Sequence, residues 1–299
     1  MSLVIVGSIA FDTIETPSGR RERIVGGSGT YSALAASFFT RPRLVGVVGR
    51  DFPKSTMAFL KKRGVDLRGL AVKPGRTFQW EGRYGEDSNQ RTTVRTDLNV
   101  FGRFEPELPA AYRGADIIFL SSIDPDLQPR ILGQAKRPRL VAMDTIRFWI
   151  ETKREAVLRE LGRVDILFAN DEEVKLIARD QNLVRAAGRI LEYGPSLVAA
   201  KKGEHGAMLF GRDFTFGVLA HPCPHVIDPT GAGDSFAGGF LGYLDRAGRS
   251  GPREFRKAAV YGSVMASFVI EDFGIERLRT LTPGQITGRY RFFKKLIEF

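Results

Sequence analysis

The stretch Leu3-Val4-Ile5-Val6-Gly7 decides the class of fold, because it is continuously apolar and ends at a glycine. A strand buried on both faces of a parallel sheet has this pattern, whereas a half-buried strand alternates apolar and polar residues. The sequence therefore predicts a central strand at residues 1–7. Parallel strands need long crossover connections, usually helices, so further apolar runs should be separated by helical patterns.

Apolar runs of the same kind recur at residues 44–48, 116–120, 140–143, 165–169 and 197–200. The helical patterns between and after them predict an open, mostly parallel α/β sheet flanked by helices. The expected helices are 30–39, 54–63, 127–135, 151–162, 173–192, 234–247, 252–270 and 283–297, and a hairpin is expected at 207–220.

Residues 72–104 interrupt this order with short alternating segments separated by glycine, aspartate and asparagine. Such segments are typical of antiparallel strands. Together with the polar, turn-rich residues 13–25, they predict a small antiparallel β lid beside the main sheet. We find no repeat and no low-complexity linker, so residues 1–299 are expected to form one domain.

The bulk composition excludes several classes of protein. No apolar run approaches the roughly 20 residues that span a bilayer, and residues 1–7 lack the basic start of a signal peptide. Cys223 is the single cysteine, which fits a reducing cytoplasm. The net charge is +11, but the basic residues are spread along the chain, so we expect no specific nucleic-acid partner. A protein that handles anionic phosphates is the simpler account.

The motif Asp228-Pro229-Thr230-Gly231-Ala232-Gly233-Asp234-Ser235-Phe236 is the most informative stretch of the chain. Its glycines form a tight turn before a helical pattern, which places the amides of Ala232, Gly233 and Asp234 near a helix N-terminus. Such amides can bind a phosphoryl group, and Asp234 could then accept a proton from the attacking hydroxyl. The alternative is that Asp234 only caps the helix.

The pattern Asp-x-Thr-Gly-Ala-Gly-Asp-x-Phe resembles the C-terminal signature of the PfkB, or ribokinase-like, kinase family, and the resemblance covers essentially the whole chain. It implies a ribokinase-like fold with a β lid and an ATP-dependent phosphotransferase that acts on an alcohol group. Asp234 would be the general base and residues 231–233 the anion hole. The resemblance also implies ATP and Mg²⁺, with a monovalent cation as a further candidate.

Further candidate residues follow from the same resemblance. Asp12, Gly26, Gly27, Ser28 and Tyr31 would bind the phosphoryl acceptor, and a carboxylate suits this task because it accepts from two hydroxyls at once. The nucleotide would contact Lys201, Gly203, Gly206 and Ser263.

Asn170 and Glu173 follow a predicted strand and resemble the family's element for hydrated Mg²⁺. A helix N-cap with an acidic first turn would give the same pattern, and both roles are compatible. Mg²⁺ keeps several waters, so side chains that reach it through solvent are sufficient.

The substrate is expected to be a sugar or sugar-like molecule, with a nucleoside kinase as the alternative. Ser28 and Tyr31 stand where ribokinase itself has Lys and Asn, which argues against ribose. A non-catalytic relative that only binds nucleotide or sugar is a third possibility, which the intact 228–236 motif disfavours. Aromatic residues of the lid, such as Trp80 and Tyr84, could stack on a base, and its arginines, such as Arg91, could bind a phosphorylated sugar. Alternatively, the lid could join two copies in a homodimer.

Overall fold

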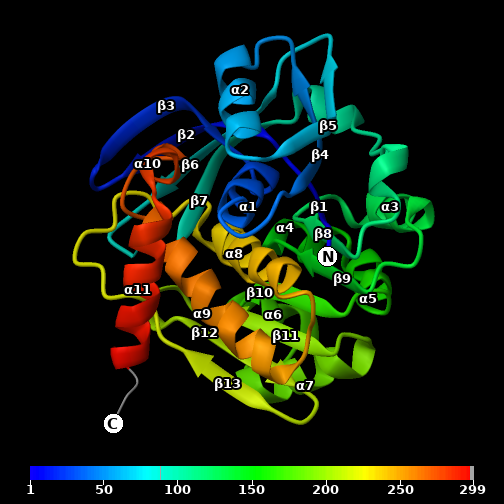
Figure 1. Ribbon diagram of the computed structural model, residues 1–299, viewed down its shortest axis with the longest axis vertical. Coiled ribbons are helices and arrows are strands. Elements are labelled where there is room, and N and C mark those ends of the chain that lie inside the picture. The colour runs from blue at the N-terminus through cyan, green and yellow to red at the C-terminus, as the bar shows by residue number, and fades with distance from the viewer. Residues whose placement is uncertain (88, 297–299) are drawn as a thin grey trace.

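The structure is a computed structural model that describes residues 1–87 and 89–296, and a nine-stranded sheet runs through it (Figure 1). Its strands are β1 (Leu3–Gly7), β4 (Arg43–Gly49), β5 (Asp66–Lys73), β8 (Ile117–Ser121), β9 (Leu140–Asp144), β10 (Ile166–Asn170), β11 (Leu197–Lys201), β12 (Ala207–Gly211) and β13 (Thr215–Val218). Their order is β13-β12-β11-β10-β9-β8-β1-β4-β5. In this spatial order, every neighbouring pair from β11 to the edge strand β5 is parallel. Strands β12 and β13 add an antiparallel hairpin at the other edge.

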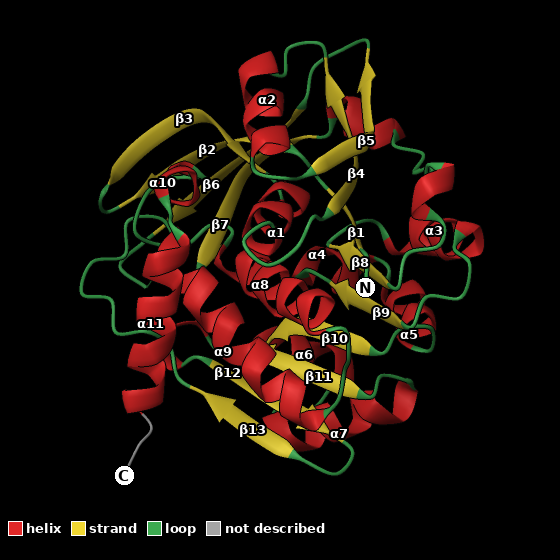
Figure 2. Ribbon diagram, in the orientation of Figure 1, coloured by secondary structure: helices red, strands yellow, loops and turns green. Residues whose placement is uncertain are grey.

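Helices cover both faces of this sheet (Figure 2). One layer comprises α1 (Ser28–Ala36), α2 (Lys54–Lys62), α8 (Ala232–Ala247), α9 (Pro252–Val269), α10 (Glu276–Thr280) and α11 (Pro283–Leu296). The other comprises α3 (Gln128–Gln134), α4 (Arg147–Thr152), α5 (Arg154–Leu161), α6 (Asp171–Ala178) and α7 (Leu183–Tyr193). The predicted α/β sandwich is thus confirmed.

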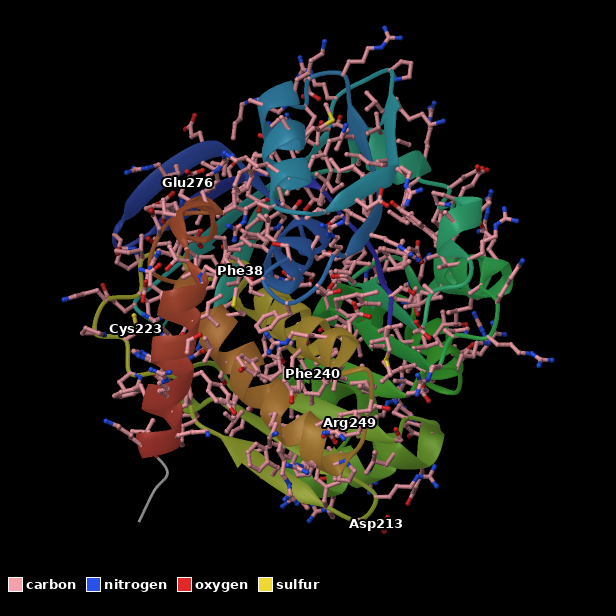
Figure 3. All side chains as sticks on the ribbon, in the orientation of Figure 1. Phe38, Asp213, Cys223, Phe240, Arg249 and Glu276 are labelled. Carbon is pink, nitrogen blue, oxygen red and sulfur yellow. The ribbon has the colours of Figure 1, made fainter. Side chains whose placement is uncertain are left out.

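The core consists of two clusters, one on each face of the sheet. In β1, Leu3 and Ile5 pack into the first cluster and Val4 and Val6 into the second, and all four side chains are fully buried. This explains the continuous apolar run, because successive side chains of a strand point to opposite faces. Phe240 of α8, labelled in Figure 3, belongs to the first cluster, and its ring lies 5.3 Å from that of Phe168.

A second, four-stranded sheet forms the lid. Its strands are β2 (Ala10–Thr16), β3 (Gly19–Gly26), β6 (Phe78–Tyr84) and β7 (Arg91–Asp97), in the order β3-β2-β6-β7. The outer pairs are antiparallel as predicted, but the central pair, β2 and β6, is parallel. The reason is that β2 continues from β1 and β6 from β5, and these two strands run in the same direction.

Local boundaries differ from the sequence prediction in four places. The helix expected at 151–162 is two helices, α4 and α5, the first of which begins at Arg147. The single helix expected at 173–192 is two helices, because Arg179 adopts a left-handed conformation with φ of 51° and Asn182 caps the next helix. Strand β5 was not predicted, and only its last two residues fell within the predicted lid at 72–104; it is an edge strand of the large sheet and only partly buried. The short helix α10 was not predicted.

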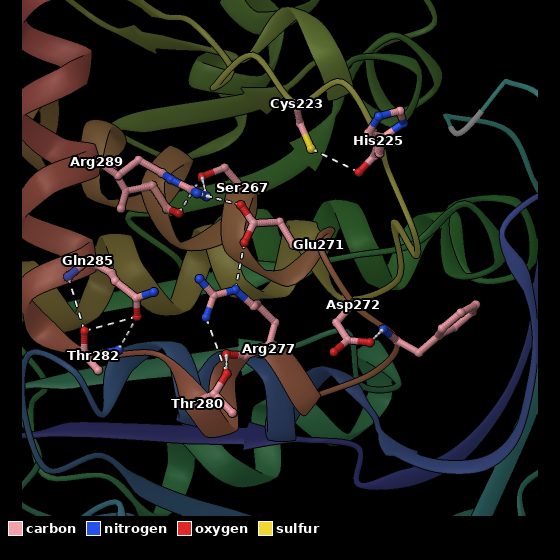
Figure 4. A network of polar contacts seen from close by, with 12 residues as sticks. Cys223, His225, Ser267, Glu271, Asp272, Arg277, Thr280, Thr282, Gln285 and Arg289 are labelled. Carbon is pink, nitrogen blue, oxygen red and sulfur yellow. Dashed lines mark hydrogen bonds and ion pairs between the residues drawn. The ribbon is translucent and has the colours of Figure 1, made fainter.

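The last two helices are tied to α9 by a polar network (Figure 4). Glu271 accepts hydrogen bonds from Arg277 at 2.7 Å and from Arg289 at 2.6 Å, and Arg289 also donates to Ser267. Within the described ranges 1–87 and 89–296, no helix has the length and apolar character required to cross a membrane.

Candidate active site

The candidate site lies where the parallel strands end, because the carboxyl ends of β9, β10 and β11 meet at one edge of the sheet. Asp144 is the last residue of β9 and Lys201 the last residue of β11. The ammonium of Lys201 donates to the Oδ2 of Asp144 at 2.6 Å, across the end of the intervening strand. Burial opposes the charge of Lys201, but Asp144 and Glu173 outweigh it and raise the pKa of this ammonium.

The turn before α8 lies next to this ion pair. Gly231 precedes the first residue of α8 and has a φ of 79°, a left-handed conformation that favours glycine. A Cβ on Gly231 would overlap the ring of Tyr31, and a Cβ on Gly233 would lie 3.1 Å from the Nζ of Lys201. The backbone amides at this helix end therefore adjoin a fixed positive charge, as an anion-binding site requires.

Asp234 is the third residue of α8, and no side chain caps this helix. The capping alternative for Asp234 is therefore wrong. Within the described part of the chain, its carboxylate accepts no hydrogen bond from protein. Burial and the neighbouring Asp144 raise the pKa of Asp234 to about 6, while Lys201 limits the rise. At neutral pH the group is largely ionised, so it can accept a proton.

Asp12 lies on β2 and faces the glycine pair at the start of α1. A Cβ on Gly26 would overlap the Asp12 carboxylate, and a Cβ on Gly27 would come within 2.6 Å of the backbone oxygen of Ser8. Both positions therefore need glycine, because a side chain there would collide with the Asp12 carboxylate or with the backbone at Ser8. Asp12 is 3% exposed, and burial together with Asp228 raises its pKa to about 8.

Ser28 and Tyr31 occupy different surroundings. Ser28 bonds internally: its hydroxyl donates to the backbone oxygen of Ser121 at 2.8 Å and lies 3.1 Å from the hydroxyl of Ser8. Tyr31 is 1% exposed, and its hydroxyl has no hydrogen-bond partner among the described residues. Burial raises the pKa of Tyr31, and the charges of Asp228 and Asp12 add to this rise.

Close packing of α1 against α8 brings the two ends of the site together. The hydroxyl of Ser32 donates to the backbone oxygen of Asp234 at 3.0 Å. A Cβ on Gly242 would come within 2.9 Å of the Cα of Ala36, and Gly238 is equally close to Ser32. The glycines of α8 therefore allow α1 and α8 to pack closely, so that the first turns of both helices border the same site.

Asn170 and Glu173 form a capping box at the start of α6. The Oδ1 of Asn170 accepts from the amide of Glu173 at 2.7 Å, and the Oε2 of Glu173 accepts from the amide of Asn170 at 2.8 Å. The helix-cap prediction is confirmed. Burial raises the pKa of Glu173 to about 7, with Lys201 acting in the opposite direction. Among residues 1–87 and 89–296, no group of three or more His, Cys, Asp or Glu could hold a metal directly.

The residues predicted to bind nucleotide lie near β11 and on α9. Gly203 and Gly206 shape the turn after β11 with φ angles of 52° and 84°. Ser263 is buried in α9, and in the described structure no hydrogen bond links its side chain to this turn. The arrangement thus groups Lys201 and Gly203 at one strand end, and the role of Ser263 stays a prediction.

Two residues beside the site were given no role of their own from the sequence: Asp144 and Thr230. Asp144 could have been found, because it directly follows the predicted strand 140–143. Tyr84 was expected only as one of the aromatic residues of the lid, and the fold of the lid brings it to the 228–236 motif.

Comparisons with known proteins agree with this geometry. Residues 2–279 match the model of the pfkB family carbohydrate kinases. The chain is 32% identical over 281 residues to a cytidine kinase of Thermococcus kodakarensis, covering 92% of this chain and 98% of that protein. It is 28% identical over 302 residues to a nucleoside kinase of Methanothermobacter thermautotrophicus, covering 92% and 91% of the two chains.

The fold also matches solved structures. The nucleoside kinase of Burkholderia thailandensis in complex with inosine superposes with a TM-score of 0.78 at 22% identity, covering 97% of this chain and 98% of that one. The full-length match to the family model, together with the sheet and turn described above, leads to one conclusion: this chain belongs to the pfkB family and is an ATP-dependent kinase of alcohol groups.

Proposed function

We propose that the chain is an ATP-dependent nucleoside kinase in which Asp234 is the general base. The observation that carries the catalytic assignment is the position of Asp234 in the first turn of α8, directly beside the amides of residues 231–233. The pKa of about 6 leaves this carboxylate ionised but still basic enough to take a proton at neutral pH.

The proposed step is an in-line phosphoryl transfer. The acceptor hydroxyl gives its proton to Asp234 while its oxygen forms a bond to the γ-phosphorus of ATP. The bond between that phosphorus and the bridging oxygen breaks, and ADP leaves with the electron pair. The amides of residues 231–233 and the ammonium of Lys201 stabilise the negative charge on the transferred group, because their dipoles and charge are already oriented.

A nucleoside is proposed as the acceptor, although the sequence by itself favoured a sugar. Support comes from the cytidine and nucleoside kinases to which the chain is similar over nine-tenths of its length. The lid adds a physical reason: Trp80 pairs in register with Asp12 across β6 and β2, so an aromatic residue stands on the strand beside the proposed hydroxyl-binding carboxylate. A free sugar is the second candidate, which Asp12 alone would serve.

We propose that Mg²⁺ binds near Asn170 and Glu173 through water. The donors present, one carboxylate and one amide, fit an ion that keeps most of its waters and is also held by phosphate oxygens. When bound, the ion would neutralise phosphate charge. A monovalent cation stays a prediction. A cytoplasmic location is proposed from the single cysteine.

The test is Asp234→Asn, with Asp213→Asn as the matched control. Asp213 lies in the exposed turn between β12 and β13, far from α8 and labelled in Figure 3. We expect Asp234→Asn to lower kcat by about 10² to 10⁴-fold with little change in the KM for ATP, because only the base is removed. ADP release would be measured with cytidine, inosine and ribose as acceptors, and Asp213→Asn should behave as wild type.

Two results would contradict the proposal. A kcat for Asp234→Asn within a few-fold of the control would show that another group takes the proton. A wild-type enzyme that phosphorylates ribose but neither nucleoside would keep the kinase mechanism and reject the proposed acceptor.

A further inference from the structure

Four buried serines surround the first turns of α1. Ser28 and Ser32 are one turn apart on α1, so their side chains lie on the same side of the helix. Ser8 directly follows β1, and Ser121 is the last residue of β8. All four residues are buried, Ser32 and Ser121 completely. Their hydroxyls therefore meet inside the molecule, at the carboxyl ends of two neighbouring strands of the large sheet.

The proton of each hydroxyl in this cluster can be assigned, because a hydroxyl donates only one hydrogen bond. Ser28 donates to the backbone oxygen of Ser121 at 2.8 Å, so in its 3.1 Å contact with Ser8 it must accept. Ser32 donates to the backbone oxygen of Asp234 at 3.0 Å. Its hydroxyl lies 3.5 Å from that of Ser121, which can only donate in this longer contact. The two serines of α1 thus bind two different elements, Ser28 the end of β8 and Ser32 the start of α8.

The contacts of Ser28 fix the beginning of α1 on the sheet. The amide of Ser28 donates to the hydroxyl of Ser8 at 3.0 Å, and the amide of Gly29 donates to the backbone oxygen of Ser8 at 2.9 Å. These bonds satisfy two of the amides that the first turn of a helix leaves free. The glycine pair that precedes Ser28 is therefore held in a set position relative to β1 and β8.

The contacts of Ser32 fix the beginning of α8 on α1. Besides the bond to Asp234, a Cβ on Gly238 would lie 2.3 Å from the backbone oxygen of Ser32. A carbonyl in the first turn of a helix already accepts from the amide four residues later, so α8 does not need the Ser32 hydroxyl in order to form. The buried hydroxyl of Ser235 has no hydrogen-bond partner among residues 1–87 and 89–296. The Ser32 bond therefore determines where α8 starts, not whether it is helical.

We propose that Ser32 is a positioning residue for Asp234. Its hydroxyl holds the first turn of α8 at a fixed place relative to the glycine pair, and so sets the distance between the base and the hydroxyl of the bound acceptor. A small displacement of a catalytic group is enough to lower the rate, because proton transfer requires close contact of the reacting atoms. Ser32 itself touches no reacting atom. This inference rests on the proposed role of Asp234 as the base.

The test compares Ser32→Ala with Ser37→Ala. Ser37 directly follows α1, and its hydroxyl donates to the backbone oxygen of Leu34 at 2.7 Å, so this matched control loses a hydroxyl that does not reach α8. We expect Ser32→Ala to lower kcat by about 3 to 10-fold, the factor that one neutral hydrogen bond provides. The KM values for ATP and nucleoside should stay within about twofold, because neither ligand loses a contact. ADP release would be measured well below the Tm of each variant, and Ser37→Ala should match wild type.

A double variant separates positioning of the base from a general structural role. When Asp234→Asn has removed the base, adding Ser32→Ala should cause no further loss of kcat, because no base is left to position. Ser32→Cys fills the same space with a weak donor, so its kcat should lie between those of Ser32→Ala and wild type. A cysteine variant with the kcat of wild type would indicate that Ser32 only fills space, and would overturn the inference.

The remaining outcomes distinguish this inference from the proposed function. An equal loss of kcat from Ser32→Ala with and without Asp234→Asn would reject the positioning role and keep the base. A raised KM for the nucleoside at unchanged kcat would also reject it, since Ser32 would then serve binding. A fully active Asp234→Asn would reject the base itself, and the role of Ser32 with it.

Discussion

The nine-stranded sheet and the lid sheet differ in how their charges are placed. In the large sheet, strands such as β1 and β10 are almost fully buried, and the charged residues Asp144 and Lys201 appear only at strand ends. In the lid, β7 is exposed along most of its length, and arginines of the outer face form ion pairs. The large sheet holds fixed charges in place at its buried edge, whereas the lid carries its charges on an exposed surface.

This difference indicates which tasks of the site belong to the large sheet and which belong to the lid. A rigid core can orient helix amides and a buried ion pair before substrate arrives, which is the requirement for stabilising a transition state. The lid sheet has two open edges, and its strand β7 is exposed, whereas β2 is mostly buried and packs with Tyr84 and with Phe273 of the body. Asp12 and Tyr31 lie between these regions, and variants there test the division most directly.

The largest effect is expected at Asp12, on the lid strand that faces the body. At pH 9, above the pKa of about 8 of Asp12, Asp12→Asn should raise the KM for the acceptor by about 10 to 150-fold, since a charge-assisted hydrogen bond contributes about 1.5–3 kcal/mol. The KM for ATP should hardly change. Steady-state kinetics with both substrates varied would measure this, and equal loss for ATP and acceptor would show that Asp12 does not serve the acceptor.

The same variant should stabilise the unliganded protein at alkaline pH. Because burial raises the pKa of Asp12 from 3.8 to about 8, the folded state holds its proton more tightly than the unfolded state. Stability is therefore lost as pH rises from about 4 to 8, and Asn removes that loss. Thermal unfolding at pH 5 and pH 9 should show a gain for Asp12→Asn only at the higher pH.

A smaller effect is expected at Tyr31, in the body. Its hydroxyl is buried without a partner in the described structure, which costs free energy until a substrate atom fills the place. Tyr31→Phe should leave Tm equal or higher and raise the acceptor KM by about 2 to 10-fold, the value of one neutral hydrogen bond. An unchanged KM would mean that Tyr31 only packs on Gly231.

We propose that the exposed lid edge around Val94 joins two copies in a homodimer. Among these variants, a change at Val94 should therefore have the smallest effect on turnover. Val94 of β7 is 53% exposed on an edge strand, and open strand edges favour pairing with another chain. Val94→Glu should shift a micromolar sample toward monomer in sedimentation equilibrium. Val184→Glu on α7, where the valine is 62% exposed, is the control. A monomeric wild type would reject the proposed dimer.

Much of the fold could be predicted because its signals are local. The run Leu3–Gly7 has the pattern of a strand covered on both faces, and the turn at residues 229–233 is recognised from glycine and proline chemistry. The edge strand β5 was missed because it is only partly buried and lacks such a run. The break at Arg179 was missed because a left-handed arginine carries no sequence signal.

The sequence by itself determined the α/β class, the position of Asp234 after a glycine turn, and the cap formed by Asn170 and Glu173. Each depends on residues a few positions apart. Only the tertiary structure decided that Thr230 meets Tyr84 across 146 positions of the chain, and that Lys201 meets Asp144 across 57. Contacts of this kind depend on strand order and register, which arise from packing of the whole core and leave no local periodicity to read.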